Sequence, residues 1–136
     1  MQSLQAAVAR PPIVLAESEA DRLAVLAEQH PSVGAALLLQ EIERADIVPD
    51  EQASDDVVRM HSIVEFVDEA RDVRRTVVLV YPREADIAAG KISITSPVGA
   101  GLIGLSVGQE ISWPDREGRE RPLRILKVRA PARLVF

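Results

Sequence analysis

The sequence predicts an α+β fold in which a short N-terminal antiparallel helical hairpin precedes a twisted, mainly antiparallel sheet with one short helix. Before residue 46 the apolar residues recur at helical spacing, whereas after residue 57 they form short runs and alternations typical of strands. Ser96-Pro97, followed by small and apolar residues, predicts the single helix of the second part. Serine caps a helix well, and proline fits its first position because its missing N–H costs nothing there.

The N-terminal part contains the two predicted helices. Residues 1–11 are expected to form a flexible tail, and Ile13–Leu15 a short strand. With Ser18 as its N-cap, the first helix should end near His30, because Pro31 cannot continue it. The second helix should begin at Ser32 and run to Ala45. So short a turn makes the two helices antiparallel.

The second part should contain the strands. Residues 47–56 are predicted to be a linker, because they are rich in acids and interrupted by a proline. We then expect strands at 57–67, 74–81, 92–95, 110–113 and 123–128, a loop with one helical turn at 82–90, the helix at 97–105 and a turn at 115–118. These assignments divide the chain into the tail, a hairpin at 12–50 and a sheet domain at 51–136.

Composition bounds the class of protein. The chain has 136 residues and no cysteine, which excludes disulfides, thiolate zinc sites and cysteine nucleophiles. No apolar run approaches the ~20 residues that a membrane helix needs, and residues 1–10 do not resemble a secretory signal. We therefore expect a cytoplasmic protein without a membrane partner.

Charge is distributed unevenly along the chain. Residues 17–56 contain eleven acids and two arginines, a local charge of −9, whereas residues 57–136 contain ten acids and thirteen bases, a local charge of +3. An acidic hairpin on a mildly basic body favours docking against a basic protein surface. Direct nucleic-acid binding would need clustered Lys and Arg, so any such contact should be indirect.

Gly99–Gly104 matches the dinucleotide fingerprint G-x-G-x-x-G. That fingerprint requires a strand before the glycines and a full crossover helix after them. Here Pro97 puts the glycines inside the helix, and too few residues follow for a crossover. We interpret the small residues as positions where the helix lies close to the sheet.

The stretch Ile-Ser-Ile-Thr-Ser-Pro-Val-Gly-Ala-Gly-Leu-Ile-Gly-Leu-Ser-Val-Gly-Gln-Glu-Ile resembles the C-terminal domain of the bacterial transcript-cleavage (GreA/GreB) factors. Together with Ile47-Val48-Pro49, residues 55–62 and Leu79-Val80-Tyr81-Pro82, it is similar to small Gre relatives of the regulator of nucleoside diphosphate kinase (Rnk) type. The resemblance covers about Pro12 to Val128. It implies an FKBP-like sheet domain and a non-catalytic transcription regulator. Such a protein would bind RNA polymerase near its secondary channel and compete there with Gre factors.

Gre factors carry two acids on the tip of a long coiled coil, where they hold Mg²⁺ at the polymerase active site. Here Glu28 is the only acid of the turn and the arm is short, so we do not expect cleavage activity. We expect no catalytic residue, cofactor or metal ligand. The candidate partner-binding residues are Glu28, Glu41 and Glu43 on the hairpin, with the two helix-2 acids on its polar side, and Arg83 and Glu84 on the loop after Tyr81.

Two alternatives remain open. The same hairpin could serve an interaction module with a partner other than polymerase. An FKBP-like prolyl isomerase is disfavoured, because its pocket would need an aromatic lining and only 3% of the residues are aromatic. His30 is expected to be a solvated tip residue. His61 stands where the resembled family usually has Asn, and it is expected on a strand with Ser62 facing the other way.

Overall fold

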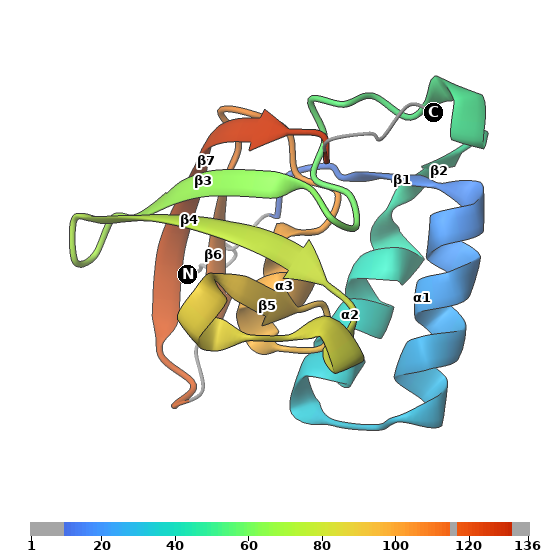
Figure 1. The fold of residues 1–136 in the computed structure, drawn as a ribbon, viewed down its shortest axis with the longest axis horizontal. Coiled ribbons are helices and arrows are strands. Elements are labelled where there is room, and N and C mark those ends of the chain that lie inside the picture. The colour runs from blue at the N-terminus through green and yellow to red at the C-terminus, as the bar shows by residue number, and fades with distance from the viewer. Residues whose placement is uncertain (1–9, 115–116, 132–136) are drawn as a thin grey trace, which may run out of the picture.

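The computed structural model describes residues 10–114 and 117–131 of the chain. In Figure 1 the helical hairpin stands at one side of a curled sheet, with a short helix between them. The hairpin region comprises β1 (Val14–Ala16), α1 (Glu17–Gln29), α2 (Val33–Arg44), β2 (Asp46–Val48) and the 3₁₀ turn η2 (Asp50–Gln52). The sheet region comprises β3 (Ile63–Asp68), β4 (Val73–Val80), η3 (Pro82–Glu84), η4 (Ile87–Ala89), β5 (Lys91–Ser93), α3 (Pro97–Leu102), β6 (Glu110–Pro114) and β7 (Glu120–Arg129).

Both hairpin helices are confirmed, but only one of their predicted caps is. The Ser32 Oγ accepts from the Ala35 N–H at 3.0 Å and caps α2 as expected. The prediction of Ser18 as the N-cap of α1 is wrong, because the helix already begins at Glu17 and has no side-chain cap. Ser18 instead donates its backbone N–H to Asp50 Oδ1 at 2.9 Å, so an acid from η2 satisfies this free donor at the helix start.

The predicted linker at 47–56 contains structure that we did not expect. Residues Asp46–Val48 form β2, which pairs in parallel with β1 in the register Val14 with Asp46 and Ala16 with Val48. This two-stranded ribbon joins the chain just before α1 to the chain just after α2 (Figure 1). The base of the hairpin is therefore closed by backbone hydrogen bonds.

The sheet has the strand order β5-β4-β3-β7-β6 and is antiparallel except for the parallel pair β4–β5. The predicted strand at 57–67 is wrong in its first half, because β3 starts only at Ile63 and the chain before it turns. His61 has a φ of 69°, which a continuous strand cannot contain. Two backbone hydrogen bonds hold the turn. The His61 N–H donates to the Leu79 carbonyl at 2.6 Å, and the Ser62 N–H donates to the Arg59 carbonyl at 3.1 Å.

The helix α3 is confirmed, capped by the Ser96 Oγ that accepts from Gly99 N–H at 3.1 Å, although it ends at Leu102. Its small residues allow close packing, as predicted. A Cβ at Gly99 would lie 2.1 Å from the Ser93 carbonyl oxygen, and one at Gly101 would lie 2.7 Å from the Trp113 ring. Neither position tolerates a side chain, so the glycines serve helix packing.

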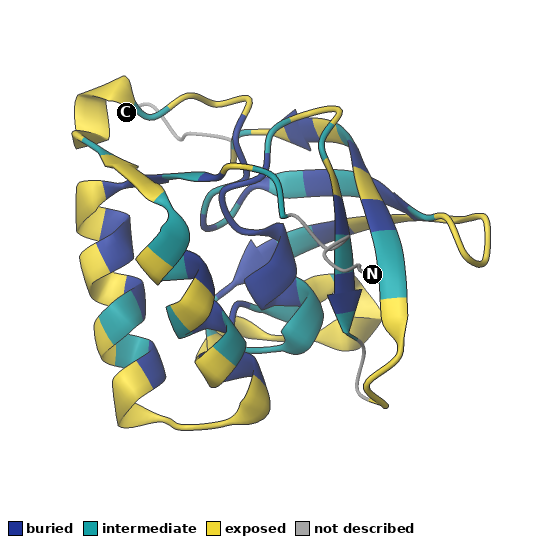
Figure 2. Ribbon diagram, turned by 180° about the vertical axis from the view of Figure 1, so that it is seen from behind, coloured by how far each residue is buried: buried dark blue, intermediate teal, exposed yellow. Residues whose placement is uncertain are grey.

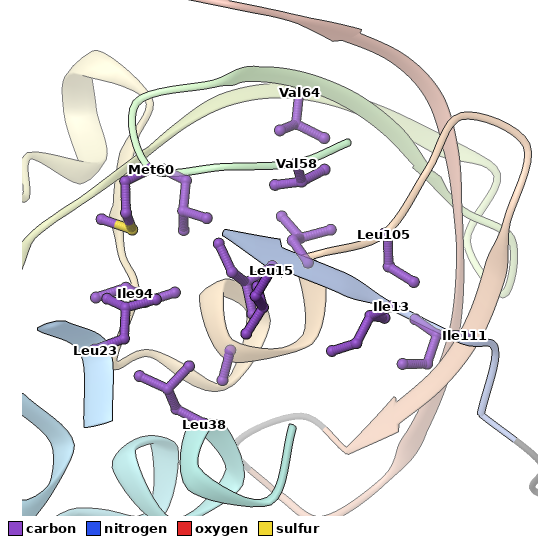
Figure 3. Close-up of a cluster of buried hydrophobic side chains, with 14 of the residues drawn as sticks. Ile13, Leu15, Leu23, Leu38, Val58, Met60, Val64, Ile94, Leu105 and Ile111 are labelled. Atoms are coloured by element: carbon purple, nitrogen blue, oxygen red, sulfur yellow. The ribbon is translucent and has the colours of Figure 1, made fainter. Parts of the chain in front are cut away.

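One hydrophobic core joins the hairpin to the sheet. Figure 3 shows Leu15 of β1 between Leu23 and Leu38 of the hairpin helices and Val58 and Leu105 of the sheet domain. Figure 2 shows exposed residues along the outer side of the hairpin and buried ones toward α3. The contact is close, since a Cβ at Gly34 of α2 would lie 1.7 Å from the Thr95 carbonyl oxygen. The predicted hairpin and sheet regions are thus held against each other by packing.

A buried carboxylate adds a polar anchor to this arrangement. Glu41 of α2 is 0% exposed, and its two oxygens accept from Arg10 Nη1 at 2.8 Å and from Arg44 Nε and Nη2 at 3.0 and 2.7 Å. Arg44 also donates to the Pro11 carbonyl at 2.6 Å. Residues 10 and 11, the end of the predicted tail, are therefore tied to α2.

Candidate partner-binding surfaces

The curled sheet holds a cavity of about 340 Å³, which we call the sheet pocket. Its apolar lining comes from all five strands of the sheet and from α3: Phe66, Val73, Val77, Ile92, Val98, Trp113, Pro114 and Leu123. Trp113 is fixed by its indole N–H, which donates to the Pro97 carbonyl, and by Arg10, whose guanidinium carbon lies 4.7 Å from the ring centroid. Sequence reasoning missed this pocket because Phe66 and Trp113 are far apart in the chain.

The rim of the sheet pocket is cationic. Arg71, Arg75 and Arg121 line it together with one acid, Asp68. Asp68 Oδ2 lies 3.5 Å from Arg121 Nη1, while Arg71 and Arg75 are exposed. An apolar floor with an arginine rim suits the apolar side chains of a protein partner that carries acids around them.

A second and larger cavity, of about 790 Å³, separates the tip of the hairpin from the loop after β4. We call it the hairpin groove. It is lined by Arg22, Leu26, His30, Ser32, Tyr81, Pro82, Arg83 and Thr95. The hairpin tip and the loop at 82–90, which the sequence placed in separate regions, therefore share one concave surface.

The predicted partner-binding residues have different environments. Glu28 and Glu43 are exposed on the hairpin, and Arg83 lines the hairpin groove. The prediction that Glu41 lies on the polar, solvent-facing side of α2 is wrong, because the side chain points to Arg10 and Arg44 and is fully buried. Helical spacing alone could not show this, since both arginines come from outside the predicted stripe.

Glu84 has a structural role in its own loop. Its Oε1 accepts from the Tyr81 N–H at 3.2 Å and lies 2.9 Å from His61 Nε2. The hydrogen bonds from His61 and then from Tyr81 hold the pKa of the Glu84 carboxyl below its usual range. His61 also meets the Tyr81 ring edge-on, with centroids 5.7 Å apart. The φ of 69° at His61 lies in the left-handed region, where His, like Asn and Asp, occurs more often than most other residues.

A buried acid lies where α1 meets this turn. Glu19 is 8% exposed, and its Oε2 accepts from the Met60 N–H at 3.3 Å, while its Oε1 has no hydrogen-bond partner among the described residues. Burial raises the pKa of the Glu19 carboxyl, against the smaller opposing effect of the Met60 hydrogen bond.

The described residues form no group of three or more His, Asp or Glu side chains that could hold a metal ion. Among the helices described, none is both long and apolar enough to cross a membrane. The described surfaces that a partner could contact are the sheet pocket, the hairpin groove and the exposed hairpin acids.

Comparison with known proteins agrees with this fold. Residues 52–130 match the model of the family described as "Transcription elongation factor, GreA/GreB, C-term". The chain belongs to the GreA/GreB family. The matched region contains the sheet, α3 and the whole lining of the sheet pocket.

Individual GreA/GreB relatives extend the similarity to the hairpin. The regulator of nucleoside diphosphate kinase of Escherichia coli K12 is 34% identical over 124 residues, which cover 89% of this chain and 91% of that protein. A prokaryotic transcription elongation factor GreA/GreB from Nitrosomonas europaea has a solved structure that is 37% identical, with a TM-score of 0.70, over 89% of this chain and 100% of that one. GreA of Acidiphilium cryptum is 40% identical over 88 residues, which cover 65% of this chain and 55% of that protein. The chain is therefore similar over nearly all of its length to the Escherichia coli regulator and to the Nitrosomonas factor, whereas the match to GreA of Acidiphilium cryptum covers about two thirds of it.

Proposed function

We propose that this protein is a non-catalytic transcription regulator that binds RNA polymerase near the entrance of its secondary channel and competes there with Gre factors. The sheet pocket carries the proposal, since it lies in the region that matches the elongation factors and combines an apolar floor with an arginine rim. Val98 of α3 contributes to this pocket, so the helix that carries the family resemblance also forms part of the docking surface. Through this binding the protein regulates nucleoside diphosphate kinase indirectly.

The hairpin supplies the second part of the proposed contact. Glu28 and Glu43 are exposed and belong to the segment of charge −9. A channel that admits nucleotides must be basic, so these acids steer the hairpin toward it. Arg83 and Glu84 are candidates for the same contact from the loop after β4.

Transcript cleavage is not part of the proposal. The hairpin tip carries Glu28 as its only acid between Ala27 and Val33, and one carboxylate is a poor holder for a Mg²⁺ ion that needs several oxygen ligands. Bound to polymerase, the protein would block Gre factors without replacing their activity.

The test is displacement of a labelled Gre factor from polymerase core enzyme by rising concentrations of this protein, followed by fluorescence anisotropy. We expect complete displacement with a single midpoint that shifts as the Gre concentration is raised. Binding to polymerase without displacement would contradict competition. An absence of binding would favour an interaction module with another partner.

A further inference from the structure

The hairpin groove has the size and lining of a small-ligand site. Its volume of about 790 Å³ lies within the range of roughly 300–1,000 Å³ that is usual for such sites. Leu26, Pro82 and the ring of Tyr81 give it apolar walls, and a few polar side chains stand between them. A planar organic group fits walls of this kind.

The charge of the hairpin groove is opposite to that of its surroundings. Arg22, Arg83 and His30 line it, and none of its lining residues is an acid. This is unexpected in a chain with 21 acids and 16 Lys and Arg, and most of all beside a hairpin segment of charge −9. Arginine is the residue best suited to phosphate, because its planar guanidinium donates two parallel hydrogen bonds.

Three acids lie near these cations but outside the lining of the groove. Glu19 and Asp50 interact electrostatically with Arg22, and Glu84 does so with Arg83. Hydrogen bonding from the side chain and then from the N–H of Ser18 lowers the pKa of Asp50, and Glu84 is held by His61 and the Tyr81 N–H. Glu19 is buried and accepts from the Met60 N–H. None of these carboxylates belongs to the lining itself, so within the groove a ligand meets the guanidinium groups without a competing acid.

Hydroxyl groups complete the lining. The buried Tyr81 hydroxyl lacks a hydrogen-bond partner of good geometry among the described residues. Hydrogen bonding and then charge interaction with the same hydroxyl raise the pKa of the Arg22 guanidinium, so the two groups lie close together. Ser32 uses its Oγ as an acceptor for the Ala35 N–H, so its hydroxyl hydrogen can donate outward. A buried hydroxyl such as that of Tyr81 is costly when unpaired, and a polar ligand would satisfy it.

We propose that the hairpin groove binds a small phosphate-bearing molecule with a flat ring, which is the chemistry of a nucleotide. Arg22 and Arg83 hold the phosphates, and Leu26, Pro82 and Tyr81 cover the ring. This site is a property of the protein alone and does not depend on polymerase binding.

The test uses the whole chain with three probes: ADP, and its two halves adenosine and inorganic pyrophosphate. Isothermal titration at low ionic strength should show ADP binding at least about tenfold more tightly than either half. The double variant R22Q/R83Q should lose about tenfold or more in ADP affinity, because each guanidinium contributes a charge-assisted hydrogen bond. R74Q/K127Q changes the net charge equally at exposed strand positions outside the groove and should bind ADP like the wild type.

Four results would overturn the proposal. The first three are no ADP binding at millimolar concentration, equal affinity for ADP and adenosine, and equal loss of affinity in R22Q/R83Q and R74Q/K127Q. The fourth is pyrophosphate binding as tightly as ADP, because the ring contact would then contribute nothing. Both arginines are exposed, so the double variant should keep its far-UV circular dichroism and melting temperature. If it does not, R83Q alone, on the exposed loop, decides the same question.

Discussion

Replacing Glu41 by glutamine should destabilise the protein substantially, although the sequence pattern predicts that Glu41 faces solvent. The carboxylate is fully buried and accepts three charge-assisted hydrogen bonds from Arg10 and Arg44. Glutamine has nearly the same shape, but its NH₂ group would face a guanidinium and its oxygen carries no charge. The substitution therefore measures the contribution of the ion pair to stability with little change in packing.

The size of the effect follows from burial. Removing one partner of a buried ion pair costs about 3–5 kcal/mol, because the remaining charge is left uncompensated. The arginine side chains are 25% and 26% exposed, so water reaches them in part, and we expect the lower end, about 3 kcal/mol. For a chain of this size, that loss corresponds to a fall in melting temperature of about 10 °C.

Urea denaturation followed by circular dichroism measures this free energy directly. E43Q is the matched control, because Glu43 is exposed two residues away on the same helix and should change stability by less than ~0.5 kcal/mol. Equal unfolding midpoints for E41Q and E43Q would refute the reasoning, since the buried anchor would then contribute nothing.

Three further predictions follow from other parts of the structure. G34A should destabilise the protein by about 1–3 kcal/mol in the same denaturation assay, because its Cβ would overlap the Thr95 carbonyl oxygen. Unchanged stability would mean that α2 does not pack this closely on the segment just before α3. The free energy of unfolding of E19Q, relative to that of the wild type, should increase as pH rises from acid to neutral. The raised pKa of Glu19 means that the folded wild type binds this proton more tightly than the unfolded chain does, so this contribution to wild-type stability is lost as pH rises. Parallel stability–pH curves for the two proteins would contradict this. The protein should not stimulate cleavage of a backtracked transcript with Mg²⁺, and robust cleavage that is lost in E28A would prove the assignment wrong.

Local patterns in the sequence predicted most of the elements. The Ser32 and Ser96 caps, the proline at the start of α3 and the glycine-rich packing of that helix each depend on neighbouring residues, and each is confirmed. The turn at 59–62 was missed because its burial alternates like a strand: Val58, Met60 and Ser62 are all buried. Periodicity cannot detect a single residue with positive φ.

The features that the sequence could not predict depend on contacts between distant segments. The β1–β2 ribbon, the Arg10–Glu41 pair and the Phe66–Trp113 pocket each join residues more than 30 positions apart. The same holds for the hairpin groove, where Arg22 and Arg83 meet only because the core fixes the hairpin against the sheet. Of the predicted surface, Glu28, Glu43 and Arg83 are placed where a partner can reach them.

Affinity for RNA polymerase core enzyme tests the central proposal most directly, if it is measured for the wild type, R75E and R74E. Arg75 and Arg74 are exposed neighbours on β4, so their side chains leave opposite faces of the sheet, and only Arg75 lines the sheet pocket. The account predicts that the wild type and R74E bind alike, whereas R75E binds at least about tenfold more weakly because charge reversal opposes a partner matched to an arginine rim. Equal affinities for all three proteins would show that the sheet pocket is not the docking surface, and no binding by the wild type would contradict the function itself.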